Sequence, residues 1–309
     1  MPESSVPDGG TDSSPGTEIQ GANHPGDSAS APENGAEAPT EEQMVVVATV
    51  PPLATLAQRI GGDAVFTRSL IPAGRSPHNF EPPPSAMRDL MRAEVVISVG
   101  SPTFAYEGRL LEPLLERRSP RPPVVSLVRI AEQDPALQLA REGAGDVHPW
   151  LHPQLLLRAA DEIALTLASV DPEGAPRYAE GARSFRAEVE RLDARNRALF
   201  EAASCRAFLV DHPAWEAFAL HYGLLQLAIE EEGKTPGPAT VSRVVAAARR
   251  EGVVQVWQRP GHPASSVLAV AEALDGEVVE IDPTAADLLG SLERAAQLIV
   301  DGCRPAPSG

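Results

Sequence analysis

Cysteine is scarce in this chain, which has only Cys205 and Cys303 among its 309 residues. The two do not form a Cys-x-x-Cys pair, which argues against a thiolate zinc site or a thioredoxin motif. Cys205 opens an apolar run, and Cys303 follows the last helical stretch. A helix returning antiparallel to its strand ends near the start of that strand, so a disulfide is geometrically possible. Two free thiols are the alternative.

Long apolar runs and basic surface are also missing. No run of about 18 apolar residues exists, so we expect no membrane span. Residues 1–12 lack the basic and apolar regions of a signal peptide. We therefore expect either a cytoplasmic protein or an exported one whose signal lies outside this sequence. The net charge of −17 argues against nucleic acid, whose binding requires a basic surface.

Several catalytic signatures are absent as well. The sequence contains no Gly-x-Ser-x-Gly and no His-Glu-x-x-His, and no Gly-x-Gly-x-x-Gly follows a strand. The tripeptide Gly233-Lys234-Thr235 does not make a phosphate loop, because Ala228 stands where a glycine is required and Pro236 blocks the following helix. Serine hydrolase, zincin and nucleotide-binding chemistry therefore lack support.

The arrangement of apolar runs predicts an α/β protein. Residues 1–43, acidic and poor in large apolar side chains, are expected to form a disordered tail. Beyond them, short runs rich in Val, Ile and Leu alternate with helical stretches, which is typical of parallel strands covered on both faces. The predicted strands are 44–50, 65–71, 94–99, 123–127, 207–211, 224–229, 253–257 and 277–282. They indicate two lobes, 44–170 and 204–309, each with a four-stranded, mainly parallel sheet flanked by helices.

A long helix over 171–203 is predicted to join the lobes. Asp171 and Pro172 suit its N-cap and first turn. An amphipathic stripe runs along it; its members are Tyr178, Phe185, Val189, Leu192 and Leu199. A rod of roughly 45 Å predicts a stiff connection and argues against wide hinge closure.

Four residues lie where an α/β sheet places its ligands, beyond the carboxyl ends of strands or at a helix start. They are His78, His148, His212 and Asp282. Two come from each lobe, so they would meet in the cleft. Neutral imidazoles and a carboxylate suit a borderline ion such as zinc. For a single loop histidine, a solvated or hydrogen-bonded role is the commoner alternative. Glu230, Glu231 and Glu232 follow a strand and are interpreted by default as a solvated charge run, with a place at the rim of the cleft as the alternative.

The sequence around these residues resembles the zinc/manganese solute-binding proteins of ABC transporters over about residues 44–301. The matching stretches include the loop SPHNFEPPPS, DVHPWLHP (146–153), FLVDHPAWEAFALHYGL (208–224), EEEGKTPGP (230–238) and EVVEIDP (277–283). The resemblance implies that His78, His148, His212 and Asp282 bind the metal. His152 replaces the usual aspartate of its stretch, and the loop before His148 has no histidine, which weakens the choice of zinc over manganese.

The resemblance implies that the protein captures Zn²⁺, or alternatively Mn²⁺, as a monomer and delivers it to an ABC permease. It places the protein in the periplasm or at the cell surface. A zinc-dependent hydrolase is the alternative, because three histidines and a carboxylate also describe catalytic sites, with Glu81 or Glu230 as general base. An adhesin built on the same fold is a third possibility.

Overall fold

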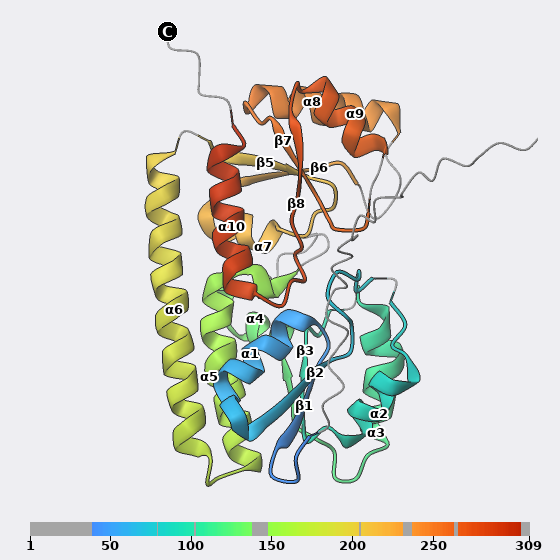
Figure 1. Ribbon diagram of the computed structural model, residues 1–309, viewed down its shortest axis with the longest axis vertical. Coiled ribbons are helices and arrows are strands. Elements are labelled where there is room, and N and C mark those ends of the chain that lie inside the picture. Colours follow the sequence, from blue (N-terminus) through green and yellow to red (C-terminus); the bar gives the residue numbers. More distant parts are fainter. Residues whose placement is uncertain are drawn as a thin grey trace, which may run out of the picture. The chain divides into compact units, whose positions relative to one another are not determined.

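A computed structural model describes residues 39–78, 80–101, 103–137, 148–203, 205–230, 237–262 and 265–303. The predicted disordered tail thus lies largely outside the described residues. The unit that contains the described residues begins at Ala38, and two lobes can be distinguished within it (Figure 1).

All eight predicted strands form, with ends that differ from the prediction by at most two residues. The first sheet has the order β2-β1-β3-β4 and the second the order β6-β5-β7-β8, and every pairing is parallel. The strands are β1 (Met44–Ala48), β2 (Val65–Ser69), β3 (Val95–Ser98), β4 (Val124–Ser126), β5 (Ala207–Val210), β6 (Leu225–Ala228), β7 (Gln255–Gln258) and β8 (Glu277–Glu280). The predicted α/β class with two four-stranded sheets is confirmed.

Helices connect the strands and cover both faces of each sheet, as parallel crossovers require. In the first lobe they are α1 (Pro51–Gly61), α2 (Pro84–Arg92), α3 (Glu112–Glu116), α4 (Leu127–Gln133) and α5 (Pro153–Val170). In the second they are α7 (Glu216–Tyr222), α8 (Pro238–Arg250), α9 (Ser265–Ala273) and α10 (Leu288–Asp301). Short single turns are η1 (Gly62–Ala64), the π-turn η2 (Glu107–Leu111), η3 (Pro135–Leu137) and η4 (Pro149–Leu151). Proline begins α1, α2, α5 and α8, where its missing N–H costs no hydrogen bond.

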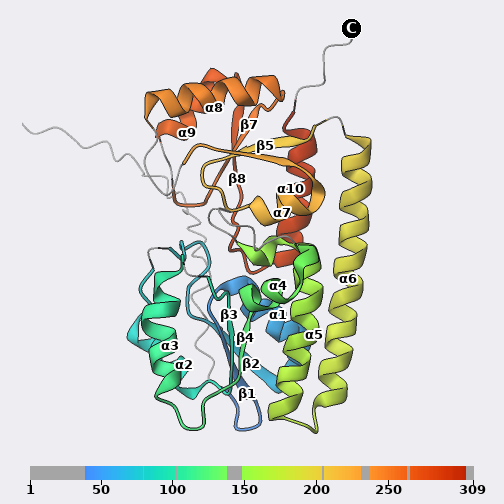
Figure 2. The ribbon, with the colours of Figure 1, turned by 180° about the vertical axis from the view of Figure 1, so that it is seen from behind.

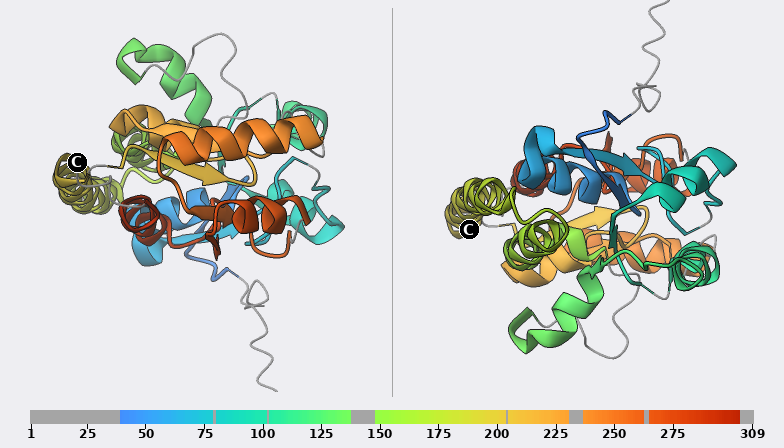
Figure 3. Two further views of the ribbon diagram at one scale, coloured as in Figure 1. Left: turned by 90° about the horizontal axis from the view of Figure 1, so that it is seen from above. Right: turned by 90° about the horizontal axis from the view of Figure 1, so that it is seen from below.

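The long helix α6 (Ala175–Ala202) links the lobes and runs beside both of them (Figures 1 and 2). Figure 3, which looks along α6, shows it end-on at one side of the two lobes. Tyr178, Phe185, Val189 and Leu192 of its apolar stripe are buried, and Leu199 is half-buried. This stripe packs on α5, α1 and α10.

The predicted start of α6 was wrong. Asp171 is the C-cap of α5, and α6 begins after Gly174. The Asp171 carboxylate accepts hydrogen bonds from the Gly174 N–H (3.1 Å) and the Tyr178 hydroxyl (2.7 Å). It therefore stabilises the turn between the two helices instead of capping the second one.

A single apolar core crosses the boundary between the lobes. Val47 of the first sheet and Leu292 of α10 belong to the same cluster of buried side chains, while α8 and α9 cover the outer face of the second sheet with a smaller cluster. A disulfide joins Cys205, just before β5, to Cys303, just after α10, with their Cα atoms 5.9 Å apart. Among the described helices, none has both the length and the apolar character needed to cross a bilayer.

Candidate metal centre

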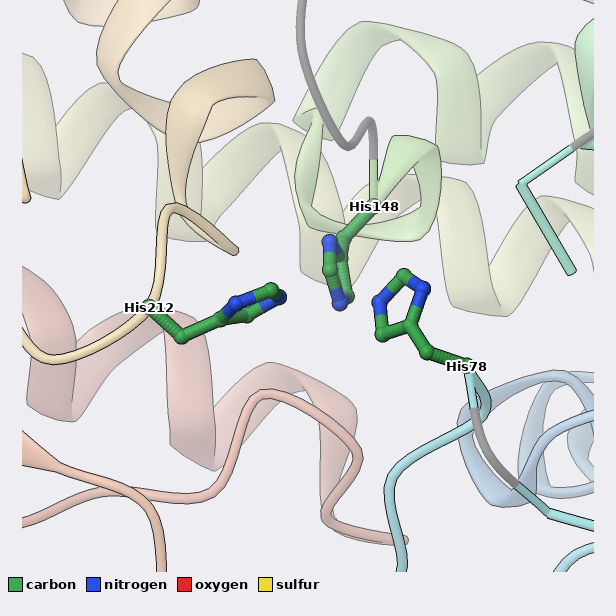
Figure 4. A group of neighbouring side chains, drawn as sticks. All are labelled: His78, His148 and His212. Carbon is green, nitrogen blue, oxygen red and sulfur yellow. The ribbon is translucent and has the colours of Figure 1, made fainter. Parts of the chain in front are cut away.

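Three of the four predicted ligands converge in the structure. His78 lies in the loop between β2 and α2, His148 directly precedes η4, and His212 follows β5. Each offers one ring nitrogen such that these atoms all lie within 4.8 Å of one another. Their rings point toward a common region from three separate segments (Figure 4). Such a set of imidazole nitrogens is suited to a divalent transition metal.

The ring positions are set by aromatic packing. Ring centroids of the three histidines are 5.2 to 5.6 Å apart. The fully buried Phe104 lies 5.0 Å from the His78 ring, and the fully buried Trp150 lies 4.9 Å from the His148 ring. These apolar side chains exclude water from one side of the histidine cluster, which strengthens electrostatic interactions there.

Among the described residues, Asp282 does not belong to the group formed by the three histidines. It does line a cavity that all three histidines also line. That cavity has a volume of about 20 Å³, comparable to the space for one water or ion. The Asp282 Oδ1 accepts hydrogen bonds from the backbone N–H and the hydroxyl of Thr284, at 2.8 and 2.7 Å. The assignment of Asp282 as a fourth ligand stays a prediction.

A second cluster of polar side chains surrounds His212, and its contacts were not predicted from the sequence. The default for Glu230 was a solvated charge run, with the cleft rim or a general base as alternatives. In the structure its Oε2 lies 3.0 Å from the His212 Nδ1, and its Oε1 accepts from Arg259 at 3.0 Å. Glu231 and Glu232 lie outside the described residues. Burial raises the pKa of Glu230, but hydrogen bonds and charge from His212 and Arg259 outweigh burial and hold that pKa below its ordinary value. The position of Glu230 just after a strand was the sequence signal for a place at the rim of the cleft, but it does not identify these two partners.

His152 has a structural role away from the three histidines. Its Nδ1 accepts the Leu155 N–H as the N-cap of α5, and its ring packs on His221 with 4.8 Å between centroids. The His221 Nε2 lies 2.7 Å from the Asp193 carboxylate of α6. Burial, together with the His221 ring, lowers the pKa of His152 to about 3.

His262 lines the cavity that the three histidines and Asp282 also line, and its Nδ1 lies 3.0 Å from the Pro260 carbonyl oxygen.

Comparison with known proteins accounts for this arrangement. Residues 46–301 match the family described as the zinc-uptake complex component A, periplasmic (ZnuA). The chain belongs to this family. Members of the ZnuA family are substrate-binding proteins of metal ABC transporters and not enzymes. The hydrolase alternative therefore loses its support, in keeping with the engagement of Glu230 by His212 and Arg259.

Individual members show the same relationship. A crystal structure of ZnuA superposes with a TM-score of 0.73 at 28% identity, covering 84% of this chain and 99% of that one. A putative metal-binding protein of Chlamydia muridarum is 26% identical over 87% of this chain and 94% of its own length. The manganese-binding lipoprotein MntA of Halalkalibacterium halodurans is 26% identical over 66% of this chain and 67% of its own. The family is thus established, while its members differ in the metal for which they are named.

Proposed function

We propose that this protein captures Zn²⁺ outside the cytoplasm through His78, His148, His212 and Asp282, and delivers it to an ABC permease. The observation that carries the proposal is the convergence of three imidazoles from three distant segments, with ligand atoms within 4.8 Å of one another. Family membership supports the transport role, and the position of Asp282 on the same cavity supports a fourth, anionic donor.

The donor set favours zinc over manganese. Three neutral nitrogens and one carboxylate can close a near-tetrahedral site, with Zn–N distances of about 2.0–2.1 Å. Manganese binds preferentially to oxygen donors and takes higher coordination numbers. A bidentate Asp282 would raise the coordination number and narrow the difference between the two metals.

Two features agree with a role outside the cytoplasm. The disulfide between Cys205 and Cys303 is a bond that oxidising compartments maintain. The relatives include a family named as periplasmic and a lipoprotein.

The long α6 and the core shared by the two lobes imply that any separation of the lobes during metal release is small.

Calorimetric titration of metal-free protein tests the proposal. We expect one tight equivalent of Zn²⁺ and a loss of affinity of at least about a hundredfold in His212→Ala, because a zinc ligand is removed. His262→Ala is the matched control, because it deletes an imidazole that lines the same cavity but lies outside the group of three. An equal loss in both variants, or no binding by the wild type, would contradict the proposal.

A parallel titration with Mn²⁺ tests the choice of metal. We expect weaker binding of Mn²⁺ than of Zn²⁺ by the wild type, because the three nitrogen donors suit zinc better. Tighter binding of Mn²⁺ would leave the site assignment intact but would contradict zinc as the cargo.

A further inference from the structure

Four charged or polar side chains meet at the carboxyl edge of the second sheet. Asp211 and His212 follow β5, Glu230 follows β6, and Arg259 follows β7. The strand order β6-β5-β7 makes these three strand ends neighbours. The fold thus brings Glu230 and Arg259 to either side of a predicted metal ligand.

The four residues form a closed ring of hydrogen bonds that includes the His212 backbone N–H. The His212 backbone N–H donates to Asp211 Oδ1 at 2.7 Å, and Asp211 Oδ2 accepts from the Arg259 Nε at 2.9 Å. Arg259 Nη2 donates to Glu230 Oε1 at 3.0 Å, and Glu230 Oε2 faces the His212 Nδ1 at 3.0 Å. The Asp211, His212 and Arg259 side chains are at most 15% exposed, and Glu230 is 29% exposed. The ring therefore fixes both the backbone and the imidazole of His212.

The chemistry of the ring assigns the two nitrogens of His212. A carboxylate accepts hydrogen bonds, so the Nδ1 that faces Glu230 carries the proton. The Nε2 is then the nitrogen without a proton, and its lone pair is the one that can bind a metal. Both Glu230 oxygens already have partners in the ring, so Glu230 acts through His212 and not as a ligand itself.

From this geometry we propose that Glu230, held by Arg259, is a positioning residue that makes position 212 selective for a nitrogen ligand and so favours Zn²⁺ over Mn²⁺. The inference rests on the proposed function. A carboxylate at position 212 would lie against the Glu230 carboxylate, and two like charges at this distance repel each other. The ring is thus compatible with an imidazole and unfavourable to the oxygen donor that manganese prefers.

The experiment compares Zn²⁺ and Mn²⁺ affinities of the full chain by calorimetric titration. In Glu230→Gln we expect the Zn²⁺ affinity to fall by about 10- to 100-fold, the range for removing a partner of a metal-bound histidine. The Mn²⁺ affinity should fall less, so the ratio of the two affinities changes. Glu280→Gln removes the same charge from an exposed strand end of the same lobe and should change neither affinity.

A double-mutant cycle separates a positioning role from general support of the fold. In a His212→Ala background, Glu230→Gln should have no further effect on Zn²⁺ affinity, because Glu230 acts through the missing ring. The His212→Glu variant should gain Mn²⁺ affinity only when it is combined with Glu230→Gln, which removes the repulsion. Nitrogen-15 NMR of the metal-free wild type should show His212 protonated on Nδ1.

The outcomes distinguish the two proposals. No Zn²⁺ binding by the wild type would overturn both. Normal wild-type binding with an unchanged Glu230→Gln variant, or equal losses for Zn²⁺ and Mn²⁺, would overturn the role of Glu230 and leave the proposed function standing. An effect of Glu230→Gln on Zn²⁺ affinity that persists in the His212→Ala background would also overturn the role of Glu230 alone. So would a His212 ring protonated on Nε2.

Discussion

The indole N–H of Trp150 donates a hydrogen bond of 2.7 Å to the carbonyl oxygen of Pro283. Trp150 lies two residues after His148 in the first lobe, and Pro283 directly follows Asp282 in the second. Both partners are buried. This bond therefore ties the segments that carry two predicted ligands together across the boundary between the lobes.

Trp150→Phe should destabilise the protein by about 1–3 kcal/mol, because it leaves the buried Pro283 carbonyl without its donor. Urea unfolding monitored by circular dichroism measures the change. Trp257→Phe is the control: Trp257 is also buried, and its ring stacks on Phe208 at 4.8 Å, so this variant reports the loss of indole volume. Equal destabilisation in the two variants would show that the hydrogen bond to Pro283 contributes little.

Gly181→Ala should also destabilise the protein, although alanine favours helices by about 1 kcal/mol over glycine. A Cβ at Gly181 would lie 2.2 Å from the backbone carbonyl oxygen of Ile60, so α6 would have to move away from α1. Such overpacking costs about 1–3 kcal/mol. Over most of this range the cost is larger than the gain of about 1 kcal/mol in helix propensity. The melting temperature should fall in Gly181→Ala and stay nearly constant in Gly108→Ala, whose Cβ would meet open space.

The strands and the positions of three histidines that lie together could be predicted from sequence because their signals are local. The run of valines in β1 predicts a strand buried on both faces, and His212 follows a similar run directly. The start of α6 was misplaced because Asp171 and Pro172 match the local pattern of a helix start. In the structure Asp171 instead ends α5, and its carboxylate accepts from Gly174 in the turn before α6. The partners of Glu230 were not predicted because they lie 18 and 29 residues away, and only the strand order of the sheet brings them together.

Acid should destabilise the protein through His152. Its pKa in the folded state is about 3, well below the ordinary value of 6.5, because burial and the neighbouring His221 oppose its protonation. Below about pH 6.5 the unfolded chain gains a proton that the folded protein does not, so stability is present above that pH and is lost as pH falls. The loss due to this group approaches about 1.4 kcal/mol per pH unit.

The variant His152→Asn separates this effect from other titrations, because asparagine can also cap α5 but does not titrate. Between about pH 7.5 and about pH 5 its unfolding free energy should fall less than that of the wild type, by on the order of 2 kcal/mol. His262→Asn removes an exposed histidine and should follow the wild type. Parallel losses in all three proteins would exclude His152 as the source.

Reducing the Cys205–Cys303 disulfide should lower the free energy of unfolding by about 2–5 kcal/mol. The bond closes a loop with a sequence separation of 98, so its loss frees many conformations of the unfolded chain. It also releases the end of α10 from the start of β5, at the edge of the sheet opposite to the one that carries His212. Urea unfolding with and without dithiothreitol measures the change. The double variant Cys205→Ala and Cys303→Ala should be insensitive to the reductant and should resemble the reduced wild type. A reductant effect that persists in the double variant would show that it acts elsewhere.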